Sequence, residues 1–488
     1  MAPRFQGFDT DQRYDELLQP DGRPRPAARL LFEYLSSICE DDLAERMRAV
    51  DAFIRDKGVT FTVYSDGENI DRAWPLDVIP RVVDAREWGR IEAGLKQRLT
   101  ALNRLIEDLY NEQAVIRDGI LPREILEQSR NFRPQCQGLK LPYGAWAHIC
   151  GTDLVRDRDG TLYVLEDNLR VPSGVSYMLE NREVMKQVFP EPFEGSGIRP
   201  LDHYPGQLLD ALISLAPADA DNPEVVLLTP GVYNAAYFEH TYLAQQMGIE
   251  LVEGRDLFVG EDDCVYMRTI YGPVRVHVIY RRIDDDFLDP EVFRPDSALG
   301  VRGLMRAWRA GRVAIANAPG AGVADNKAVY SFVPELIRYY LDEAPLLANV
   351  PTWRCLFEDE RAYVLDHLDE LVVKPANESG GYGMLIGPHA DPATRSAFAE
   401  QICRDPANFI AQPTLSLSTV PTFNGEHLEP RHVDLRPFVL QAARQHVTTG
   451  GLSRVSNARD SLVVNSSQGG SSKDTWVVDV RSDEQEGG

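Results

Sequence analysis

The sequence has few cysteines and lacks any long apolar run. Its cysteines lie far apart, with no pair in the CxxC spacing of zinc sites, so neither a zinc site nor a disulfide framework is indicated. The six cysteines are Cys39, Cys136, Cys150, Cys264, Cys355 and Cys403. No segment approaches the roughly 18 apolar residues of a membrane span, and the first residues lack the apolar stretch of a signal peptide. We therefore expect a cytoplasmic protein that does not bind a membrane.

Basic residues are scarce relative to acidic ones. Lys and Arg number 51 against 75 Asp and Glu, which gives a formal net charge of −24. Most of this surface would repel a nucleic acid, so an anionic ligand would need a local basic pocket. The 488 residues are 43% hydrophobic and 26% charged, the profile of a soluble globular protein. This length suggests roughly two to four structural units.

Hydrophobic spacing predicts alternating helices and strands. Apolar residues at spacings of three and four predict helices over about residues 93–111 and over 327–341. The strings EVVLLTPG and IELVEG flank a helical pattern, which is typical of a βαβ unit and predicts a Rossmann-like layer over roughly residues 200–300. Two alternating runs around residues 157–160 predict a β-hairpin, and ELVVKP, NFIAQP, RHVDLRPFVL and SLVVNSS predict further strands.

The predicted hairpin carries the most informative polar residues. Glu166 and Asn168 are two positions apart on one strand, so their side chains point to the same face. A four-residue turn would place Asp153 opposite Val164, on that face and diagonal to Glu166. Two carboxylates and an amide offer only hard oxygen ligands, which suits Mg²⁺ that holds nucleotide phosphates. The alternative is an ordinary solvated hairpin end.

A second polar constellation follows the string VVKP. Lys374 ends an apolar strand just before a loop that holds Gly380, Gly381 and Gly383. Backbone N–H groups of such a loop can approach phosphates while the lysine supplies positive charge. The loop matches neither the Walker P-loop nor the GxGxxG dinucleotide pattern, so a surface turn is the competing interpretation.

A third constellation lies near the C-terminus. In RHVDLRPFVL, alternation puts Asp434 and Arg436 on one face of a strand, and a strand-borne arginine can clamp a carboxylate or a transferring phosphoryl group. Donors and glycines that could cradle an anion follow: Arg454, Asn465, Gly469, Gly470 and Lys473. A glycine-rich surface loop is the alternative. In RRIDDDFLDP, Arg281 and Arg282 precede three aspartates, which is more typical of a capped, salt-bridged turn than of a substrate site.

Together these motifs resemble the ATP-grasp ligases in an unusual order. The Asp153 and Glu166-x-Asn168 set stands before the Rossmann-like unit, whereas ordinary members carry it at the end of the chain. YRRIDDDFLDP, DNKAVYSFVPELI and VVNSSQGGSSKDTW are similar to signatures of the circularly permuted ATP-grasp family, often described as glutathionylspermidine synthase-like. The resemblance implies an α/β fold. Its parts would be N-terminal helices with the permuted magnesium-ligand part (1–195), a Rossmann-like pre-ATP-grasp unit (196–315), ATP-grasp lobes (316–480) and a disordered tail (481–488).

The resemblance also implies roles for individual residues. Lys327, Lys374 and the glycine loop would contact ATP phosphates, and Gln412 would lie on the strand that meets adenine. Mg²⁺ would be held by Asp153, Glu166 and Asn168. The reacting acyl phosphate would face Arg436, Arg454, Asn465 and the Gly469 and Gly470 loop, with Lys473 as a further catalytic candidate.

The expected activity is an ATP-dependent carboxylate–amine ligase that forms an amide bond through an acyl phosphate. Two alternatives stay open: a non-catalytic nucleotide-binding protein of the same fold, and a phosphotransferase that stops at a phosphorylated product. The acidic surface favours a cationic amine as one substrate. A homodimer is the commonest default for the oligomeric state.

Overall fold

A nine-stranded sheet at the centre of the computed structural model joins strands from the two halves of the chain. The structure describes residues 5, 8, 10, 13–65, 68–195, 197–377, 383–458, 461, 464 and 470–480. Strands β4 (Ile149–Arg156) and β5 (Leu162–Asn168) form the predicted hairpin, and β4 pairs antiparallel with strands of the C-terminal half. The remaining strands of this sheet are β13 (Ala348–Asn349), β18 (Thr419–Phe423), β19 (Leu428–Arg436), β20 (Phe438–Gln441), β21 (Gln445–Val447), β22 (Leu452–Val455) and β23 (Ser471–Lys473).

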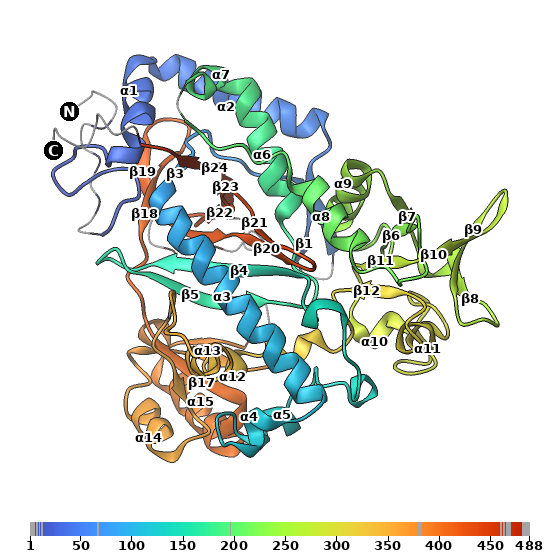
Figure 1. The fold of residues 1–488 in the computed structure, drawn as a ribbon. Helices are drawn as coiled ribbons and strands as arrows, with labels where there is room; N and C mark the ends of the chain where they lie inside the picture. Colours follow the sequence, from blue (N-terminus) through green and yellow to red (C-terminus); the bar gives the residue numbers. More distant parts are fainter. Residues whose placement is uncertain are drawn as a thin grey trace.

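A four-stranded parallel sheet confirms the βαβ prediction. Its order is β12-β11-β6-β7, and every pairing is parallel. The strands and their connecting helix are β6 (Val225–Leu228), α9 (Tyr237–Met247), β7 (Glu250–Val252), β11 (Val278–Arg281) and β12 (Ala314–Ala316). An antiparallel ribbon of β8 (Leu257–Val259), β9 (Val265–Thr269) and β10 (Gly272–Val276) projects outward from this unit (Figure 1). The Rossmann-like layer therefore extends somewhat beyond the predicted residue 300.

A smaller antiparallel sheet carries the strands predicted in ELVVKP and NFIAQP. Its order is β14-β17-β15-β16, and it has an apolar core of its own. The elements of this unit are β14 (Trp353–Arg354), α14 (Glu358–Asp366), β15 (Leu371–Pro375), β16 (Leu385–Ile386), α15 (Pro392–Arg404) and β17 (Phe409–Pro413). In Figure 1 this unit lies on the other side of the β4–β5 hairpin from the strands β19 to β23.

Helix α3 (Ala85–Tyr110) crosses the middle of the molecule and is longer than the predicted 93–111 (Figure 1). It begins at Ala85 because the Asp84 side chain accepts hydrogen bonds from the first free N–H groups of the helix. Its buried face packs against α13 (Val333–Leu341) and the nine-stranded sheet. The single helix predicted over 327–341 is two helices, α12 (Lys327–Tyr330) and α13, and Pro334 stands in the first turn of the second one, where its missing N–H costs nothing.

The N-terminal helix α2 (Glu40–Asp56) lies beside α6 (Val175–Val188), and α1 (Arg29–Ser37) lies beside α7 (Pro190–Phe193) (Figure 1). The ribbon β1 (Thr60–Ser65) and β2 (Glu68–Ala73) follows. Then β3 (Arg81–Asp84) pairs parallel with β24 (Thr475–Val478), which ties the two ends of the chain together. Helix α8 (Tyr204–Ile213) packs beside α9. No helix in the described ranges has the length and apolar character that a membrane crossing requires.

Candidate functional site

Asp153 and Glu166 face each other directly across β4 and β5. The Asp153 side chain is 2% exposed, so its carboxylate is almost completely removed from solvent. Asn168 joins the pair, because its amide nitrogen donates a hydrogen bond to Asp153 Oδ1 at 3.2 Å. The three predicted magnesium ligands therefore lie together on one face of the hairpin.

The predicted register of this hairpin is wrong by two residues at Asp153. The turn contains residues 157–161, one residue more than predicted. A β-bulge at Leu165 then adds a second residue to one strand only. Asp153 consequently faces Glu166 instead of Val164. The two carboxyl groups form a direct cross-strand pair, which is closer than the predicted diagonal.

Two arginines from the C-terminal half contact these carboxylates. Arg436, at the end of β19, is ion-paired with Asp153, and Arg454 on β22 lies 3.4 Å from the same Asp153 oxygen. Asp434 accepts a hydrogen bond from Arg454 Nε at 3.0 Å and fixes this guanidinium. Arg436 differs, because its Nε is buried and has no hydrogen-bond partner in the described part of the chain. At the Asp153 carboxylate, Arg436 is thus an arginine with an unsatisfied buried donor.

Two lysines approach from the opposite side. Lys327 Nζ, at the start of α12, lies 3.5 Å from Glu166 Oε2. Lys374 on β15 and Gln412 on β17 are diagonal neighbours, and Lys374 Nζ donates to Gln412 Oε1 at 2.8 Å. Gln412 in turn donates to Thr352 Oγ1 at 3.0 Å. The small antiparallel sheet and α12 thereby bring positive charge to the carboxylates of the nine-stranded sheet.

The charges of this cluster perturb one another. Burial raises the pKa of Asp153 to about 7, and the Glu166 charge adds to the rise while the two arginines oppose it. Desolvation also acts on Glu166, but Lys327 and the other nearby cations outweigh it and lower the pKa of Glu166. Desolvation lowers the pKa of Lys374 to about 8. The group is therefore a tightly coupled set of acids and bases whose charges depend on what is bound between them.

The oxygen donors fit a divalent cation of the magnesium type. Asp153, Glu166 and Asn168 present two carboxylates and one amide from adjacent strand positions, with no soft donor among them. Over the residues that the structure describes, no cluster of three or more His, Cys, Asp or Glu side chains forms a metal site. This set would thus leave part of the coordination shell to phosphates and water, which is the usual arrangement for Mg²⁺. A cation here would compete with Arg436 for Asp153.

A hollow opens beside Glu166, between the chain segments 166–170 and 324–327. It is lined by Asn131, Glu166, Asp167, Asn168, Arg170, Ala324, Asp325, Asn326, Lys327, Tyr330, Ala376 and Asn377. Sequence reasoning named Glu166, Asn168 and Lys327 but missed Arg170 and Asp325. A signal for both existed, since Arg170 stands two positions after Asn168 and Asp325 stands two positions before Lys327.

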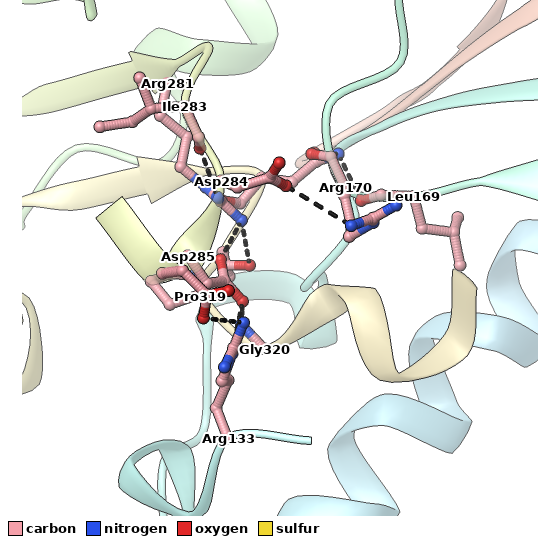
Figure 2. Close-up of polar contacts among 12 residues, drawn as sticks. Arg133, Leu169, Arg170, Arg281, Ile283, Asp284, Asp285, Pro319 and Gly320 are labelled. Atoms are coloured by element: carbon pink, nitrogen blue, oxygen red, sulfur yellow. Dashed lines mark hydrogen bonds and ion pairs between the residues drawn. The ribbon is translucent and has the colours of Figure 1, made fainter. Parts of the chain in front are cut away.

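Asp325 and Asn317 hold the chain just after β5, which ends at Asn168. Asp325 accepts from Leu169 N at 2.9 Å and from Arg170 Nε at 2.6 Å. The Asn317 amide donates to the backbone carbonyls of the same two residues at 2.8 and 3.2 Å. Figure 2 shows Arg170 directed toward Asp284 of the parallel-sheet unit, at 3.6 Å. The segment that follows β12 thus holds Leu169 and Arg170, and Asp284 of the parallel-sheet unit lies beside Arg170.

Glu239 and Arg282 form a second, buried connection between the parallel-sheet unit and the segment that follows β5. Glu239 on α9 accepts hydrogen bonds at 2.7 Å from Ser173 Oγ and from Gly174 N. Arg282, just after β11, is ion-paired with Glu239 at 2.7 Å and donates to Pro172 O at 2.7 Å. Both charges are almost fully buried, so they are part of the fold and not of a solvent-exposed site.

The string RRIDDDFLDP is salt-bridged as predicted, but it lacks the predicted cap. Arg281 is buried and pairs with Asp285, as Figure 2 shows. The nitrogen–oxygen distance of this pair is 2.7 Å, and Arg133 pairs with Asp286 at 2.7 Å. Asp284 precedes helix α10 (Asp285–Leu288) without making a side-chain capping hydrogen bond. Its carboxylate, 53% exposed, therefore stays directed at Arg170.

Lys473 lies apart from the cluster. It pairs with Ser453 across β22 and β23, so its side chain points to the face opposite that of Arg454. Its ammonium is fully buried, is ion-paired with Asp77, and donates to two backbone carbonyls, each at 2.9 Å. These three acceptors match the three donors of an ammonium group. The structure thus does not bring Lys473 to the residues for which a catalytic role was predicted.

The glycine-rich loops are only partly described. Gly380, Gly381, Asn465 and Gly469 lie outside the described residues, as does most of SLVVNSS and all of the predicted disordered tail. Gly383 has a φ of +68°, a conformation that glycine adopts readily. Gly470 is buried directly before β23. The phosphate contacts of these loops stay predictions.

The architecture and the cluster define a class of protein. A lysine-bearing antiparallel sheet faces a carboxylate-bearing sheet, and the carboxylate hairpin precedes the Rossmann-like unit in the chain, which is the arrangement of a circularly permuted ATP-grasp fold. The chain belongs to the circularly permuted ATP-grasp type 2 family, whose model matches residues 80–456. The resemblance and the fold class predicted from the sequence are thereby confirmed.

Comparison with a solved structure agrees with this fold. A glutathione synthetase-like effector from Globodera pallida, in its apo form, superposes with a TM-score of 0.59 over 91% of this chain and 98% of its own. The two chains are 12% identical, so the likeness concerns the fold alone.

Several relatives are similar over almost the whole chain. An uncharacterized protein of Synechocystis is 56% identical over 476 residues, which are 97% of this chain and 99% of that protein. An uncharacterized protein of Mycobacterium tuberculosis H37Rv is 48% identical over 98% of this chain and 87% of its own length. A Frankia casuarinae protein named "Putative glutamate--cysteine ligase 2-2" is 42% identical over 98% of this chain and 55% of its own length. This chain thus spans about half of the Frankia relative.

Proposed function

We propose that the protein is an ATP-dependent carboxylate–amine ligase that works through an acyl phosphate. The observation that carries the proposal is the convergence of Lys327, Lys374, Arg436 and Arg454 on the Asp153–Glu166 pair. Such a set offers positive charge for the phosphates of a nucleotide and oxygen ligands for its metal ion.

The reaction would proceed in two displacements. A substrate carboxylate oxygen attacks the γ-phosphorus of ATP, the bond from that phosphorus to the β,γ-bridging oxygen breaks, and ADP leaves. The amine nitrogen then attacks the acyl carbon, the bond to the phosphate oxygen breaks, and inorganic phosphate leaves while the surplus proton of the amine passes to solvent. Both steps need fixed positive charge around the phosphoryl oxygens and a defined place for the carboxylate.

The side chains of this chain can be assigned to those needs. Lys327 and Lys374 would offset the charge of the ATP phosphates. Arg436, whose buried Nε has an unused donor, would contact the acyl phosphate. Bound by Asp153, Glu166 and Asn168, Mg²⁺ would supply further positive charge to the phosphates.

The name of the Frankia relatives supports the reaction class. Two Frankia proteins named as glutamate–cysteine ligases are 42% and 44% identical to this chain, and such a ligase joins a carboxylate to an amine. The chain matches only 55% and 54% of those proteins, so their substrates are not assigned to it.

Trapping of the acyl phosphate tests the proposal. The full chain is incubated with Mg-ATP, a mixture of amino acids and simple carboxylic acids, and hydroxylamine, which converts an acyl phosphate into a stable hydroxamate. We expect ADP and hydroxamate to form together. Glu166→Gln should lower both about 100-fold without changing the denaturation midpoint. Glu370→Gln, at an exposed position on the lysine-bearing unit, is the matched control and should leave both unchanged.

The other outcomes identify the alternatives. ADP that accumulates without hydroxamate, together with a stable phosphorylated product, would contradict the ligase and identify a phosphotransferase. Bound ATP that is never converted to ADP with any carboxylate would identify a non-catalytic nucleotide-binding protein.

A further inference from the structure

The hollow beside Glu166 is lined by Arg170 as well as by Glu166 and Lys327. Glu166 and Lys327 lie 3.5 Å apart and line one part of the hollow, on the side where the phosphate lysines stand. Arg170 stands two residues after the end of β5 and lines the same hollow. A molecule that pairs with Arg170 would therefore lie near the phosphates that Lys327 is expected to contact.

Arg170 is held in that position by its surroundings. Its Nε donates to Asp325 at 2.6 Å, and its aliphatic stem lies against Gly322, where a Cβ would come within 2.6 Å of Arg170 Cδ. Its outer nitrogen lies 3.6 Å from Asp284, which is longer than a hydrogen-bonded ion pair. Both side chains keep solvent access, 32% for Arg170 and 53% for Asp284. A loose, accessible pair of opposite charges can open to accept a ligand that carries both charges.

Asp284 also stands where parallel sheets bind ligands. The chain leaves β6 toward β7 on one side, and β11 pairs with β6 on the other, so the sheet reverses its order between β6 and β11. Ligands of open α/β sheets bind at such a switch point, at the carboxyl ends of the strands. Asp284 follows the carboxyl end of β11, and the exposed Val232 and Tyr233 follow that of β6. The Arg282 contact to Pro172 O ties the chain after Arg170 to this same edge.

We propose that Arg170 and Asp284 form the binding site of the carboxylate substrate and that this substrate is a zwitterion, an α-amino acid or the end of a peptide. The proposal deepens the proposed ligase function and rests on it. The substrate carboxylate pairs with Arg170 beside the ATP phosphates, and its ammonium pairs with Asp284. A ligand that satisfies both charges replaces the loose pair without leaving either charge unpartnered.

Turnover with charge-matched substrates tests this assignment. ADP formation from Mg-ATP is measured with each common L-amino acid, with its N-acetyl derivative, which lacks the ammonium, and with its amide, which lacks the carboxylate. We expect stimulation by one or a few free amino acids or dipeptides and none by the derivatives. Asp284→Asn should raise the KM for that amino acid at least tenfold and leave the KM for ATP within twofold. Asp286→Asn is the matched control, since Asp286 is also 53% exposed but pairs with Arg133, and it should change neither.

The contrary results distinguish a failure of the zwitterion assignment from a failure of the ligase function. Equal stimulation by the N-acetyl derivative, or an unchanged amino-acid KM in Asp284→Asn, would overturn the zwitterion assignment and leave the ligase standing. Mg-ATP binding without stimulation by any zwitterion, while another carboxylic acid stimulates, would do the same. An absence of Mg-ATP binding to the wild-type chain would overturn the proposed function and this inference with it. Arg170→Lys, which keeps the charge, should retain more amino-acid affinity than Arg170→Gln; equal losses would point to a structural role for Arg170.

Discussion

Lys374 and Lys473 are both strand-borne lysines whose pKa is lowered by desolvation, yet their surroundings differ. Lys473 is fully buried and has one carboxylate and two carbonyls within hydrogen-bond distance. Lys374 is only partly buried, and the hydrogen bond that the described structure gives its ammonium goes to the neutral amide of Gln412. One ammonium is completely satisfied by the fold, and the other is not.

Hydrogen-bond partners distinguish a charge that stabilises the fold from a charge that is available to a ligand. A buried charge whose hydrogen-bond partners all lie within the chain has no donor or acceptor left for a ligand. Removing that charge leaves its partner buried without a counter-charge. A charge with one neutral partner has a solvation deficit that an anionic ligand can make up. On this criterion, we expect Lys374 to contact the nucleotide, whereas Lys473 is part of the structural core.

Replacement of Lys473 should destabilise the protein far more than replacement of Lys374. Lys473→Met should lower the free energy of unfolding by about 3–5 kcal/mol, because it leaves the Asp77 carboxylate buried without its cation. Urea denaturation of the full chain measures this. Lys186→Met, at a half-exposed ion pair on α6, is the control and should cost about 0.5 kcal/mol or less. A loss for Lys473→Met no greater than for this control would contradict the structural assignment.

Lys374→Met should reduce activity strongly and stability only slightly. Turnover of Mg-ATP should fall about 100-fold, because the substitution removes a positive charge that would contact the ATP phosphates. The free energy of unfolding should change by no more than about 1 kcal/mol, because no carboxylate is left unpaired. Steady-state kinetics together with urea denaturation check both halves. A variant that unfolds easily but still turns over ATP would reverse the comparison.

The lowered pKa of Lys374 gives a pH dependence with a definite sign. With a pKa of about 8, the ammonium is charged below pH 8 and neutral above it, so affinity for Mg-ATP should fall as the pH rises. Between pH 7 and pH 9 the Kd should increase about tenfold. Lys374→Arg keeps its charge throughout and should show a flat profile over this range. An equal rise in that variant would assign the titration to another group.

Gln412→Glu should shift the same profile by a smaller amount. A carboxylate beside Lys374 Nζ, in place of the amide oxygen at 2.8 Å, favours the charged ammonium and raises the pKa of Lys374. The pH at which Mg-ATP affinity falls should therefore move upward by about one unit. A midpoint that does not move would show that Lys374 does not control the profile.

Much of the site could be predicted because its residues are local in sequence. Glu166 and Asn168 share a face by strand alternation, and Asp153 joins them through a short hairpin. The bulge at Leu165 could not be predicted, since one extra residue on one strand leaves the apolar pattern almost unchanged. The structure places these three residues on one face, as predicted, but the predicted register between the two strands was wrong.

The role of Lys473 could not be predicted because its partner is distant in sequence. Asp77 and Lys473 are 396 positions apart, and only the pairing of the two chain ends brings them together. Arg282 and Glu239 are a similar case, since a charge next to aspartates gives no sign that it is buried against another helix. Local spacing predicts which residues share a strand, whereas the partners of buried charges follow from tertiary packing.

Titration calorimetry with ATP can show whether Glu166 and Asn168 hold the metal ion of a bound nucleotide. The full chain is titrated with and without Mg²⁺, as wild type and as the Glu166→Ala/Asn168→Ala double variant, with urea denaturation to confirm that the variant is folded. We predict binding to the wild type that is strongly strengthened by Mg²⁺ and a loss of that strengthening in the double variant. Equal ATP affinity with and without Mg²⁺ in the wild type, or an unchanged Mg²⁺ effect in the folded variant, would contradict the account.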